Sequence, residues 1–203
     1  MEFQWIDIGL EDQIDAATLT QKSKATGTAD PDPVSNFTKT YACSWTGSYY
    51  GDGTRRNSSG YIYQGQYSGF AGNGNQRAMI GFPYTTIQSN TAGATIKKCE
   101  VYLYFNHWYF NSGGTAVIGT HNSTAASAPT TFSGTTSRVN SANWPKPGGR
   151  WVSIGTTIGN EFKNNTAKGI VIGPGDTTGN LYYGYADGFG KPKPPKLRIT
   201  YSK

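Results

Sequence analysis

The sequence predicts an all-β protein: an antiparallel β-sandwich of the jelly-roll type, with one short helix and an extended or partly helical N-terminal arm. Charged residues make up only 15% of the 203 residues, whereas the chain contains 27 Gly and 14 Tyr. Such a composition suits short strands joined by many turns. The apolar segments also follow one another without the strand–helix–strand rhythm of a parallel sheet, which favours an antiparallel sandwich.

The longest segment without turn residues, 94–110 (ATIKKCEVYLYFNHWYF), predicts the central strand. Its β-branched and aromatic residues fit a pleated, half-buried surface better than a helix. Strict alternation puts two sets of side chains on opposite faces: Val101, Leu103, Phe105, His107 and Tyr109 on one, Tyr102, Tyr104, Asn106, Trp108 and Phe110 on the other. Two interpretations remain open: a core strand throughout, or a strand whose His107-Trp108-Tyr109 end reaches the rim and helps to form a binding surface.

Eight further segments have the composition of strands: 37–45, 61–67, 76–83, 115–121, 150–155, 169–173, 181–186 and 196–202. The run 156–165 predicts the short helix, and 85–94 predicts a short crossover leading into the central strand. Residues 46–60 predict a long polar loop around Gly51-Asp52-Gly53. The segment 121–149 is longer and poor in apolar residues, and loops of such length are usually functional or disordered.

The chain divides at about residue 33 into an attachment or assembly arm with its linker (1–33) and the sandwich domain (34–203). Residues 1–35 carry seven acidic and two basic side chains, whereas the remainder carries sixteen basic and five acidic ones. The positive domain favours an anionic partner such as a wall polymer. Its basic residues are scattered, so a basic patch that binds nucleic acid is not expected. The arm is too poor in apolar residues for a core of its own, so we expect it to pack against another subunit.

Cysteines and hydropathy set two further limits. Cys43 and Cys99 fall in expected strands, and a disulfide between them and two free buried thiols remain equal alternatives. The sequence contains no run of 18 apolar residues, so no membrane insertion is expected.

A set of motifs then points to a family. They occur in the order SYYGDGTRRN, YIYQGQYSG, GNGNQRAMIGFP, FNHWYFNSGG, IGTHN, YGYADG and PPKLRITYSK. From about Phe37 to Lys203 the chain resembles the C-terminal domain of minor tail proteins of phages infecting actinobacteria. The segments GATIKKCEVYLYF, RWVSIGTTIGNEF and KGIVIGP are also similar to the DNRLRE-type jelly-roll modules. The resemblance implies a virion protein, at a tail tip or fibre, that meets the host surface.

The polar residues do not suggest catalysis or a bound metal. Outside the arm the carboxylates lie singly in turns or on solvated faces, and a glycosidase needs two that face one cleft. His107 and His121 have no partner at metal-ligand spacing. No enzyme activity and no cofactor are therefore expected. Calcium is the alternative, because Asp52 and Asp187 supply hard ligands if their loops meet.

Aromatic residues in or beside loops instead favour a ligand-binding surface, since sugar rings stack on aromatic faces. We expect the 46–60 loop, the 107–109 strand end and the 185–188 turn to converge at one end of the sandwich. The expected ligand-binding residues are Tyr49, Tyr50, Arg55, Arg56, His107, Trp108, Tyr109, Tyr185 and Asp187.

The functional prediction is a virion component that adheres to a host cell-wall glycan, acts in several copies as a homo-oligomer, and contacts other virion subunits through its arm. One alternative is a capsid or tail decoration protein that stabilises the virion without a receptor role. A second alternative is a secreted carbohydrate-binding module. One sandwich fold hosts all three functions, so the sequence does not separate them.

Overall fold

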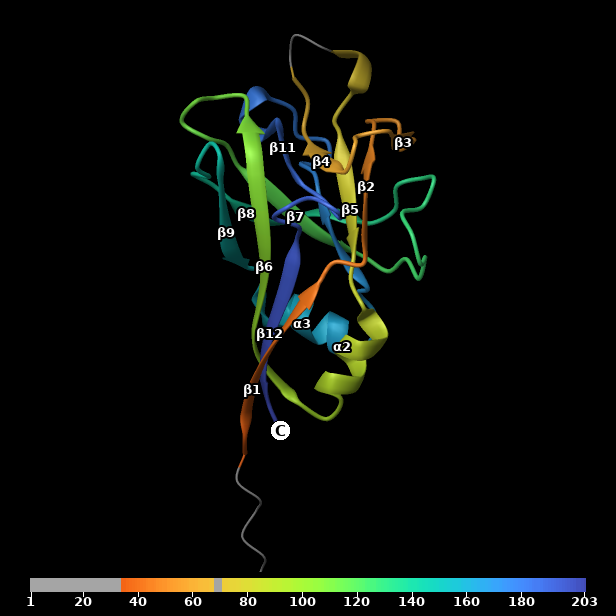
Figure 1. The fold of residues 1–203 in the computed structure, drawn as a ribbon, viewed down its shortest axis with the longest axis vertical. Helices are drawn as coiled ribbons and strands as arrows, with labels where there is room; N and C mark the ends of the chain where they lie inside the picture. Colours follow the sequence, from red (N-terminus) through yellow and green to blue (C-terminus); the bar gives the residue numbers. More distant parts are fainter. Residues whose placement is uncertain (1–33, 68–70) are drawn as a thin grey trace, which may run out of the picture. The chain divides into compact units, whose positions relative to one another are not determined.

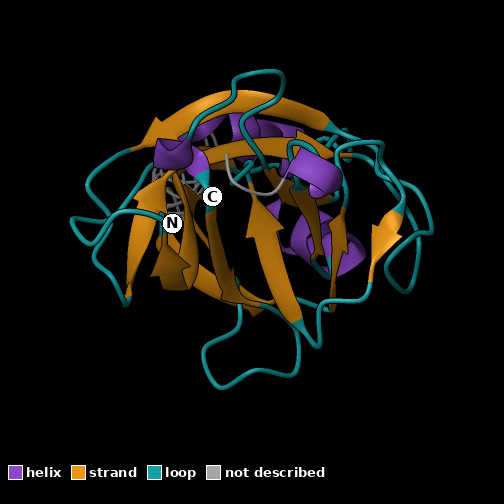
Figure 2. Cartoon of the chain, turned by 90° about the horizontal axis from the view of Figure 1, so that it is seen from above, coloured by secondary structure: helices purple, strands orange, loops and turns teal. Residues whose placement is uncertain are grey.

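Two antiparallel β-sheets face each other in the computed structural model, which describes residues 34–67 and 71–203 (Figure 1). This arrangement confirms the expected all-β sandwich. The expectations for the arm lie outside the described residues. Seen from above, the strands of the two sheets enclose the core between them (Figure 2).

The first sheet has the strand order β1-β12-β6-β11-β4, and β9 pairs with β6 beside this path. Its strands are β1 (Asn36–Ala42), β4 (Tyr61–Gln64), β6 (Thr95–Trp108), β9 (Gly148–Ser153), β11 (Gly184–Asp187) and β12 (Lys196–Ser202). The long strand β6 is the centre of this sheet, because β12, β9 and β11 all pair with it. The prediction of a central strand at 94–110 is therefore confirmed.

The second sheet has the order β3-β2-β5-β10-β7-β8. Its strands are β2 (Trp45–Tyr49), β3 (Arg55–Arg56), β5 (Arg77–Gly81), β7 (Ala116–His121), β8 (Thr135–Ser141) and β10 (Gly169–Ile172). The continuous apolar run of β10 lies between β5 and β7 and is fully buried, as its sequence indicates.

Some strand boundaries differ from the expected ones. The single strand expected at 37–45 is two strands in different sheets, because the chain crosses from one layer to the other at Cys43 and Ser44. The expected excursion 121–149 contains β8, and β3 forms within the expected 46–60 loop. The strand expected at 181–186 starts as a short 3-10 helix, η2 (Asn180–Tyr182), and becomes extended only at Gly184.

Within residues 34–67 and 71–203 there are two α-helices, where the sequence predicted one. α3 (Gly155–Lys163) matches the predicted helix, whereas α2 (Tyr84–Thr91) replaces the expected crossover. α2 starts directly after Pro83 and buries Ile87 and Thr91, so tertiary packing stabilises a segment of weak helical periodicity. A further 3-10 helix, η1, spans Ala71–Asn73. Over the described ranges, every helix is too short or too polar to cross a bilayer.

The core between the sheets contains the inward side chains of β6 and β12 together with Phe162 of α3 and Trp144. Cys43 and Cys99 both lie in this core as free thiols, so the structure selects the second of the two cysteine alternatives. Burial raises the pKa of each thiol to about 12. Both cysteines are therefore uncharged packing residues at neutral pH.

Candidate functional site

A β-bulge in β6 decides which side chains reach the surface. Tyr185 of β11 pairs with His107, but its neighbour Ala186 pairs with Phe105, so Asn106 is an extra residue. Asn106 and His107 consequently both point outward, and the next residue, Trp108, points into the core. Strict alternation, which placed Trp108 on the same face as Tyr102 and Tyr104, is wrong from this bulge onward.

Outside the bulge lies a continuous row of aromatic rings, which we call the tyrosine surface. It comprises Tyr61, Tyr63, Tyr67, His107, Tyr109, Tyr183 and Tyr185. Tyr63, Tyr185 and His107 lie side by side on β4, β11 and β6 because these residues are paired in the sheet. The ring centroids of Tyr185 are 5.3 Å from Tyr63 and 5.5 Å from His107.

Rings in the middle of this surface stack on one another, so they present mainly edges and hydroxyl groups to the solvent. The planes of His107 and Tyr185 differ by only 19°. Partial burial raises the pKa of both Tyr63 and Tyr183. The pKa of His107 is lowered, first by burial and then by Lys146, so its imidazole is neutral at pH 7.

The far end of the tyrosine surface offers more accessible rings. Tyr67 and Tyr109 are 40% and 38% exposed, and their centroids are 5.4 Å apart. Between Tyr67 and Tyr183 lies a pocket of about 190 Å³, whose other described walls are Asn73 and Gln76. Two tyrosines and two amide residues therefore line the same small cavity.

Arg56 connects this pocket to the rest of the surface. Its guanidinium lies 3.9 Å from the ring centroid of Tyr63 and 5.9 Å from that of Tyr50. The same group donates a hydrogen bond to the side-chain oxygen of Gln76. Four of the expected binding residues, Tyr50, Arg56, His107 and Tyr185, are thus brought together, and Tyr109 joins them through Tyr67.

Three expected binding residues are buried and lie outside this surface. Trp108 is 0% exposed and stacks on Phe105 with centroids 4.1 Å apart. Tyr49 is buried on the outer side of the second sheet, where it donates a hydrogen bond to Pro129 O, and burial raises its pKa to about 12. The buried carboxylate of Asp187 accepts hydrogen bonds from Asn106 Nδ2 and Lys193 N, which fixes the following loop to the bulge.

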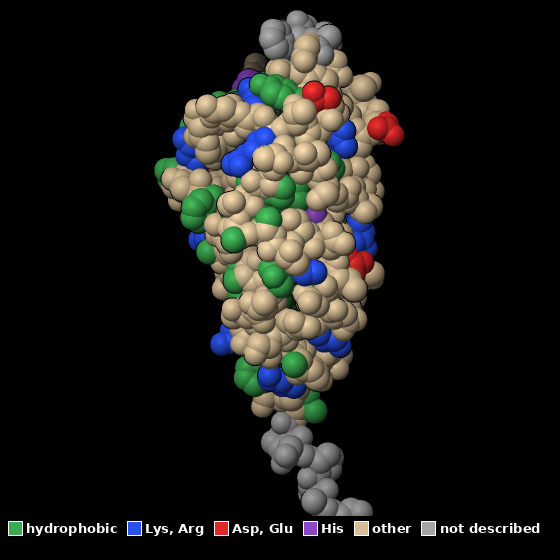
Figure 3. All heavy atoms as spheres, turned by 90° about the vertical axis from the view of Figure 1, so that its right-hand side faces the viewer, with side chains coloured by type: hydrophobic (Ala, Val, Ile, Leu, Met, Phe, Trp, Pro, Cys, Tyr) green, Lys and Arg blue, Asp and Glu red, His purple; other side chains and the backbone are tan. Residues whose placement is uncertain are grey.

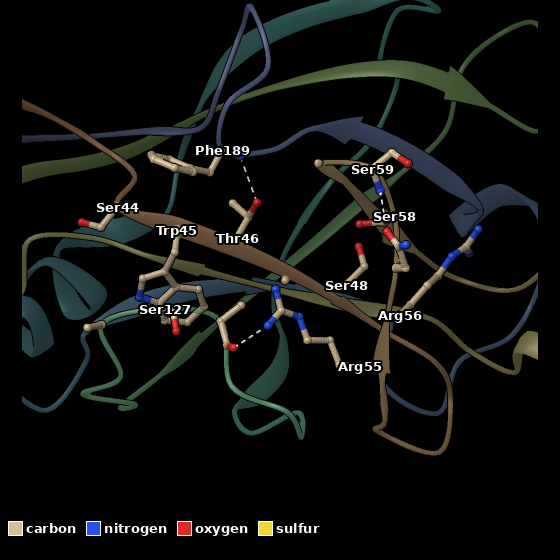
Figure 4. Close-up of a pocket in the computed structure, with 15 residues that line it drawn as sticks. Ser44, Trp45, Thr46, Ser48, Arg55, Arg56, Ser58, Ser59, Ser127 and Phe189 are labelled. Carbon is tan, nitrogen blue, oxygen red and sulfur yellow. Dashed lines mark hydrogen bonds between the residues drawn. The ribbon is translucent and has the colours of Figure 1, made fainter.

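The side chains of Arg55 and Arg56 point toward different parts of the surface. The two residues are adjacent on β3, so their side chains point in opposite directions. Figure 4 shows Arg55 directed toward Trp45 and Ser127, whereas Arg56 turns away. Arg55 lies in a groove of about 770 Å³ lined by residues 44–48, 55–60 and 126–128 and by Phe189, which we call the serine groove.

Trp45 and His121 form a rigid base near this groove. Their rings stack with centroids 5.3 Å apart, and Trp45 Nε1 donates to Ala125 O at 2.8 Å. Because Ser123 N donates to His121 Nδ1, the proton of a neutral His121 lies on Nε2, which donates to Ile80 O at 3.1 Å. Burial and the nearby Lys168 lower the pKa of His121 to about 4.

This buried imidazole makes domain stability depend on pH. The pKa of His121 is about 4 in the folded chain and 6.5 in its ordinary state, so between these values the unfolded chain binds the proton that the folded chain excludes. The free energy of unfolding is therefore expected to fall as the pH drops from 6.5 to 4, by about 1.4 kcal/mol per pH unit in the middle of this window. Urea unfolding at pH 7 and pH 4.5 measures it.

The matched variant for this measurement is His121→Gln, which keeps a side-chain donor and acceptor but does not titrate. The lowered pKa of His107 also makes the domain less stable as the pH falls, and it does so in both proteins. The difference in pH-dependent stability between wild type and His121→Gln is therefore the contribution of His121. An equal loss of stability in both proteins between pH 7 and pH 4.5 would contradict this role.

The carboxylates near these surfaces accept hydrogen bonds from nearby residues, including residues of their own loops. Asp52 Oδ1 accepts hydrogen bonds from both the backbone N and the hydroxyl of Thr54, and these bonds lower the pKa of Asp52. Asp187 is held as described above. Within residues 34–67 and 71–203, no three His, Cys, Asp or Glu side chains are grouped as ligands for a metal ion.

The expected binding residues did not include Tyr61, Tyr63, Tyr67 and Tyr183, which make up most of the tyrosine surface. The YIYQ run carried a signal for two of them: period-two alternation around the buried Ile62 puts Tyr61 and Tyr63 on the outer face. Tyr67 and Tyr183 lie outside strands, so no such signal existed for them. Comparison with known proteins adds no assignment: no protein-family model matches the chain, and no curated protein is similar to it.

Proposed function

We propose that this chain is a phage virion protein whose sandwich domain adheres, without catalysis, to a glycan of the host cell surface. The observation that supports the proposal best is the pocket lined by Tyr67 and Tyr183 together with the amide residues Asn73 and Gln76. Rings bind the apolar faces of sugars, and amides bind sugar hydroxyls. The proposal of a virion location rests on the motifs that resemble minor tail proteins.

The rigidity of the tyrosine surface supports a binding role. Tyrosine offers a large amphipathic contact area with few rotatable bonds, so little side-chain entropy is lost on binding. Here each ring is further held by its neighbours or by the sheet. The outward hydroxyls add donors and acceptors that suit a polyhydroxylated ligand.

Such a site binds weakly as a single copy. One aromatic contact and two or three hydrogen bonds correspond to a dissociation constant of roughly millimolar to micromolar. Several copies on one virion multiply this affinity through avidity. We therefore propose that the protein acts as an oligomer, with the acidic N-terminal arm contacting other virion subunits.

Tyr67→Ala is expected to weaken binding of the full chain to soluble fragments of host wall glycan by about tenfold, the equivalent of ~1.4 kcal/mol, because it removes one wall of the pocket. Isothermal titration calorimetry measures the change. Its matched control is Tyr84→Ala, which removes a half-buried tyrosine of α2 that also lies near a cation, Lys168. Equal affinities for Tyr67→Ala and wild type would contradict the assigned pocket.

Immunogold electron microscopy tests the virion location. A label confined to the distal tail supports adhesion. An ordered array of label over the capsid would instead favour the alternative of a decoration protein without a receptor role. Protein found only free in the medium would favour a secreted carbohydrate-binding module.

A further inference from the structure

The serine groove has the chemistry of a second ligand subsite. It runs beside β2 and is lined on several sides by hydroxyl groups, among them those of Ser44, Ser58 and Ser127. These three side chains make no hydrogen bond with the described part of the protein. Phe189, which is 55% exposed, stands at the edge of the groove.

Arg55 gives the groove a fixed positive charge. Its Nη1 donates to Ala128 O at 2.8 Å, which anchors the guanidinium while its other N–H groups remain available. A guanidinium held in this way is preorganised to bind an oxyanion with two parallel hydrogen bonds. The described part of the chain supplies no carboxylate that forms an ion pair with Arg55.

The surroundings of the groove are also positive. None of the described residues that line it is acidic. Lys191 packs against Gly60 at the rim of the groove, and its ammonium lies 4.0 Å from the ring centroid of Tyr61. On the side of the domain that carries β3, basic side chains are scattered over the surface and acidic ones are sparse (Figure 3).

The groove and the tyrosine surface are neighbours along the chain and in space. Arg56 borders the groove and also covers Tyr63, and the turn at 57–60 leads from the groove directly into Tyr61. One extended ligand can therefore contact both regions.

We propose that the serine groove binds an oxyanion substituent of the glycan, a phosphate, sulfate or carboxylate, with Arg55 as its principal ligand. The proposal rests on the proposed function only in taking the ligand to be a glycan. The groove hydroxyls bind the neighbouring sugar hydroxyls, and Lys191 adds a second positive charge at the rim. The receptor is accordingly an anionic wall polymer rather than a neutral polysaccharide.

A glycan fits these surfaces better than a nucleic acid. Single-stranded nucleic acids bind through bases that stack on open aromatic faces. Here Arg56 and Lys191 lie over the rings of Tyr63 and Tyr61, so the rings nearest the groove are already covered. The hydroxyl-lined groove favours a ligand with many hydroxyl groups.

The test compares binding of the full chain to dextran sulfate and to uncharged dextran of the same length, by biolayer interferometry at physiological salt. Arg55→Gln is expected to weaken binding to dextran sulfate about tenfold and to leave binding to dextran unchanged, because one charge-assisted contact is lost. Arg55→Lys keeps the charge but loses the planar guanidinium. Its affinity for dextran sulfate is expected to lie between those of wild type and Arg55→Gln. The control Lys97→Gln removes an exposed charge near the start of β6, at the opposite end of this strand from His107. It is expected to change binding to dextran sulfate less than twofold.

Three outcomes would overturn the proposal. Equal losses for Arg55→Gln and Lys97→Gln would show ion exchange without a site. Full competition by sodium sulfate at the same sulfate concentration would show that a free anion suffices. Double-stranded DNA that binds as tightly as dextran sulfate, with the same dependence on Arg55, would show a general polyanion surface. Tyr67→Ala reports on the proposed function separately, since its loss of wall binding does not require a charge on the ligand.

Discussion

Replacing Trp108 by alanine is expected to destabilise the sandwich domain severely, by about 3–5 kcal/mol. The indole is fully buried, stacks on Phe105 and lies 6.4 Å, centroid to centroid, from Trp144. Its ring also packs directly on the backbone of Gly114 and Gly184, where a Cβ would come within 2.6 Å or less of the indole. Because domains of this kind are stable by only roughly 5–15 kcal/mol, a loss of this size is a large fraction of the total.

Urea unfolding followed by circular dichroism measures this loss. Tyr109→Ala, one residue further along, is the matched control and is expected to cost less than about 1 kcal/mol because Tyr109 is 38% exposed and lies outside the core. The loss of stability for Trp108→Phe is expected to lie between those of Trp108→Ala and Tyr109→Ala. This variant keeps an aromatic ring and removes a buried indole N–H that has no described hydrogen-bond partner. A Trp108→Ala protein that is as stable as wild type but deficient in glycan binding would contradict this assignment and would show that Trp108 belongs to the binding surface.

Gly113→Ala is expected to destabilise the domain by a similar amount, about 4 kcal/mol or more. Gly113 has a φ of +98°, and a Cβ at this position would lie 1.6 Å from Trp144 O, a backbone atom that has little room to move. The 111–114 turn would have to separate from Trp144, and the Gly114 O acceptor of Trp144 N would move with it.

Gly190→Ala separates the two causes of this loss. Gly190 has a similar φ of +82°, but a Cβ there meets no atom within 4 Å. It is expected to cost about 1–2 kcal/mol from backbone strain alone. The difference between the two variants, measured by thermal and urea unfolding, is the cost of the collision; equal losses would show that the close approach to Trp144 does not matter.

The fold was readable from the sequence wherever burial is periodic. Cys99, Val101, Leu103 and Phe105 alternate with outward residues, and all four are buried as β6 requires. The continuous apolar run of β10 likewise predicted a strand covered on both faces. The composition, with few charged residues and many Gly and Tyr, was enough to favour a β-sandwich over a helical bundle.

The features that could not be predicted from the sequence depend on contacts between segments that are distant along the chain. The bulge at Asn106 exists because β11 pairs out of register with β6, and it reverses the direction of Trp108. The burial of Tyr49 follows from the 122–134 segment, which covers the outer face of the second sheet at Ala128 and Phe132. α2 is stabilised by contacts with α3 rather than by its own periodicity.

The candidate site was predictable only in part for the same reason. Loop aromatics and charges identified Arg56, His107 and Tyr185. The pairing of β11 with β6 places Tyr185 beside His107, and Arg56 reaches the same surface by lying over Tyr63 of β4. Tyr67 and Tyr183 approach each other across 116 positions of sequence, a separation at which local patterns carry no information. Asp187, a plausible polar ligand from its Gly-flanked turn, is instead a buried anchor of the loop that follows it.

Co-sedimentation with purified host cell walls tests the central claim of glycan adhesion most directly. The full-length wild-type protein is expected to sediment saturably with intact walls and to remain in solution when the walls have been stripped of their polysaccharide. Tyr67→Ala is expected to sediment less than wild type at every concentration, and Tyr84→Ala to match wild type. Binding to stripped walls at the level seen with intact walls, or equal sedimentation of Tyr67→Ala and wild type, would contradict adhesion through the tyrosine surface.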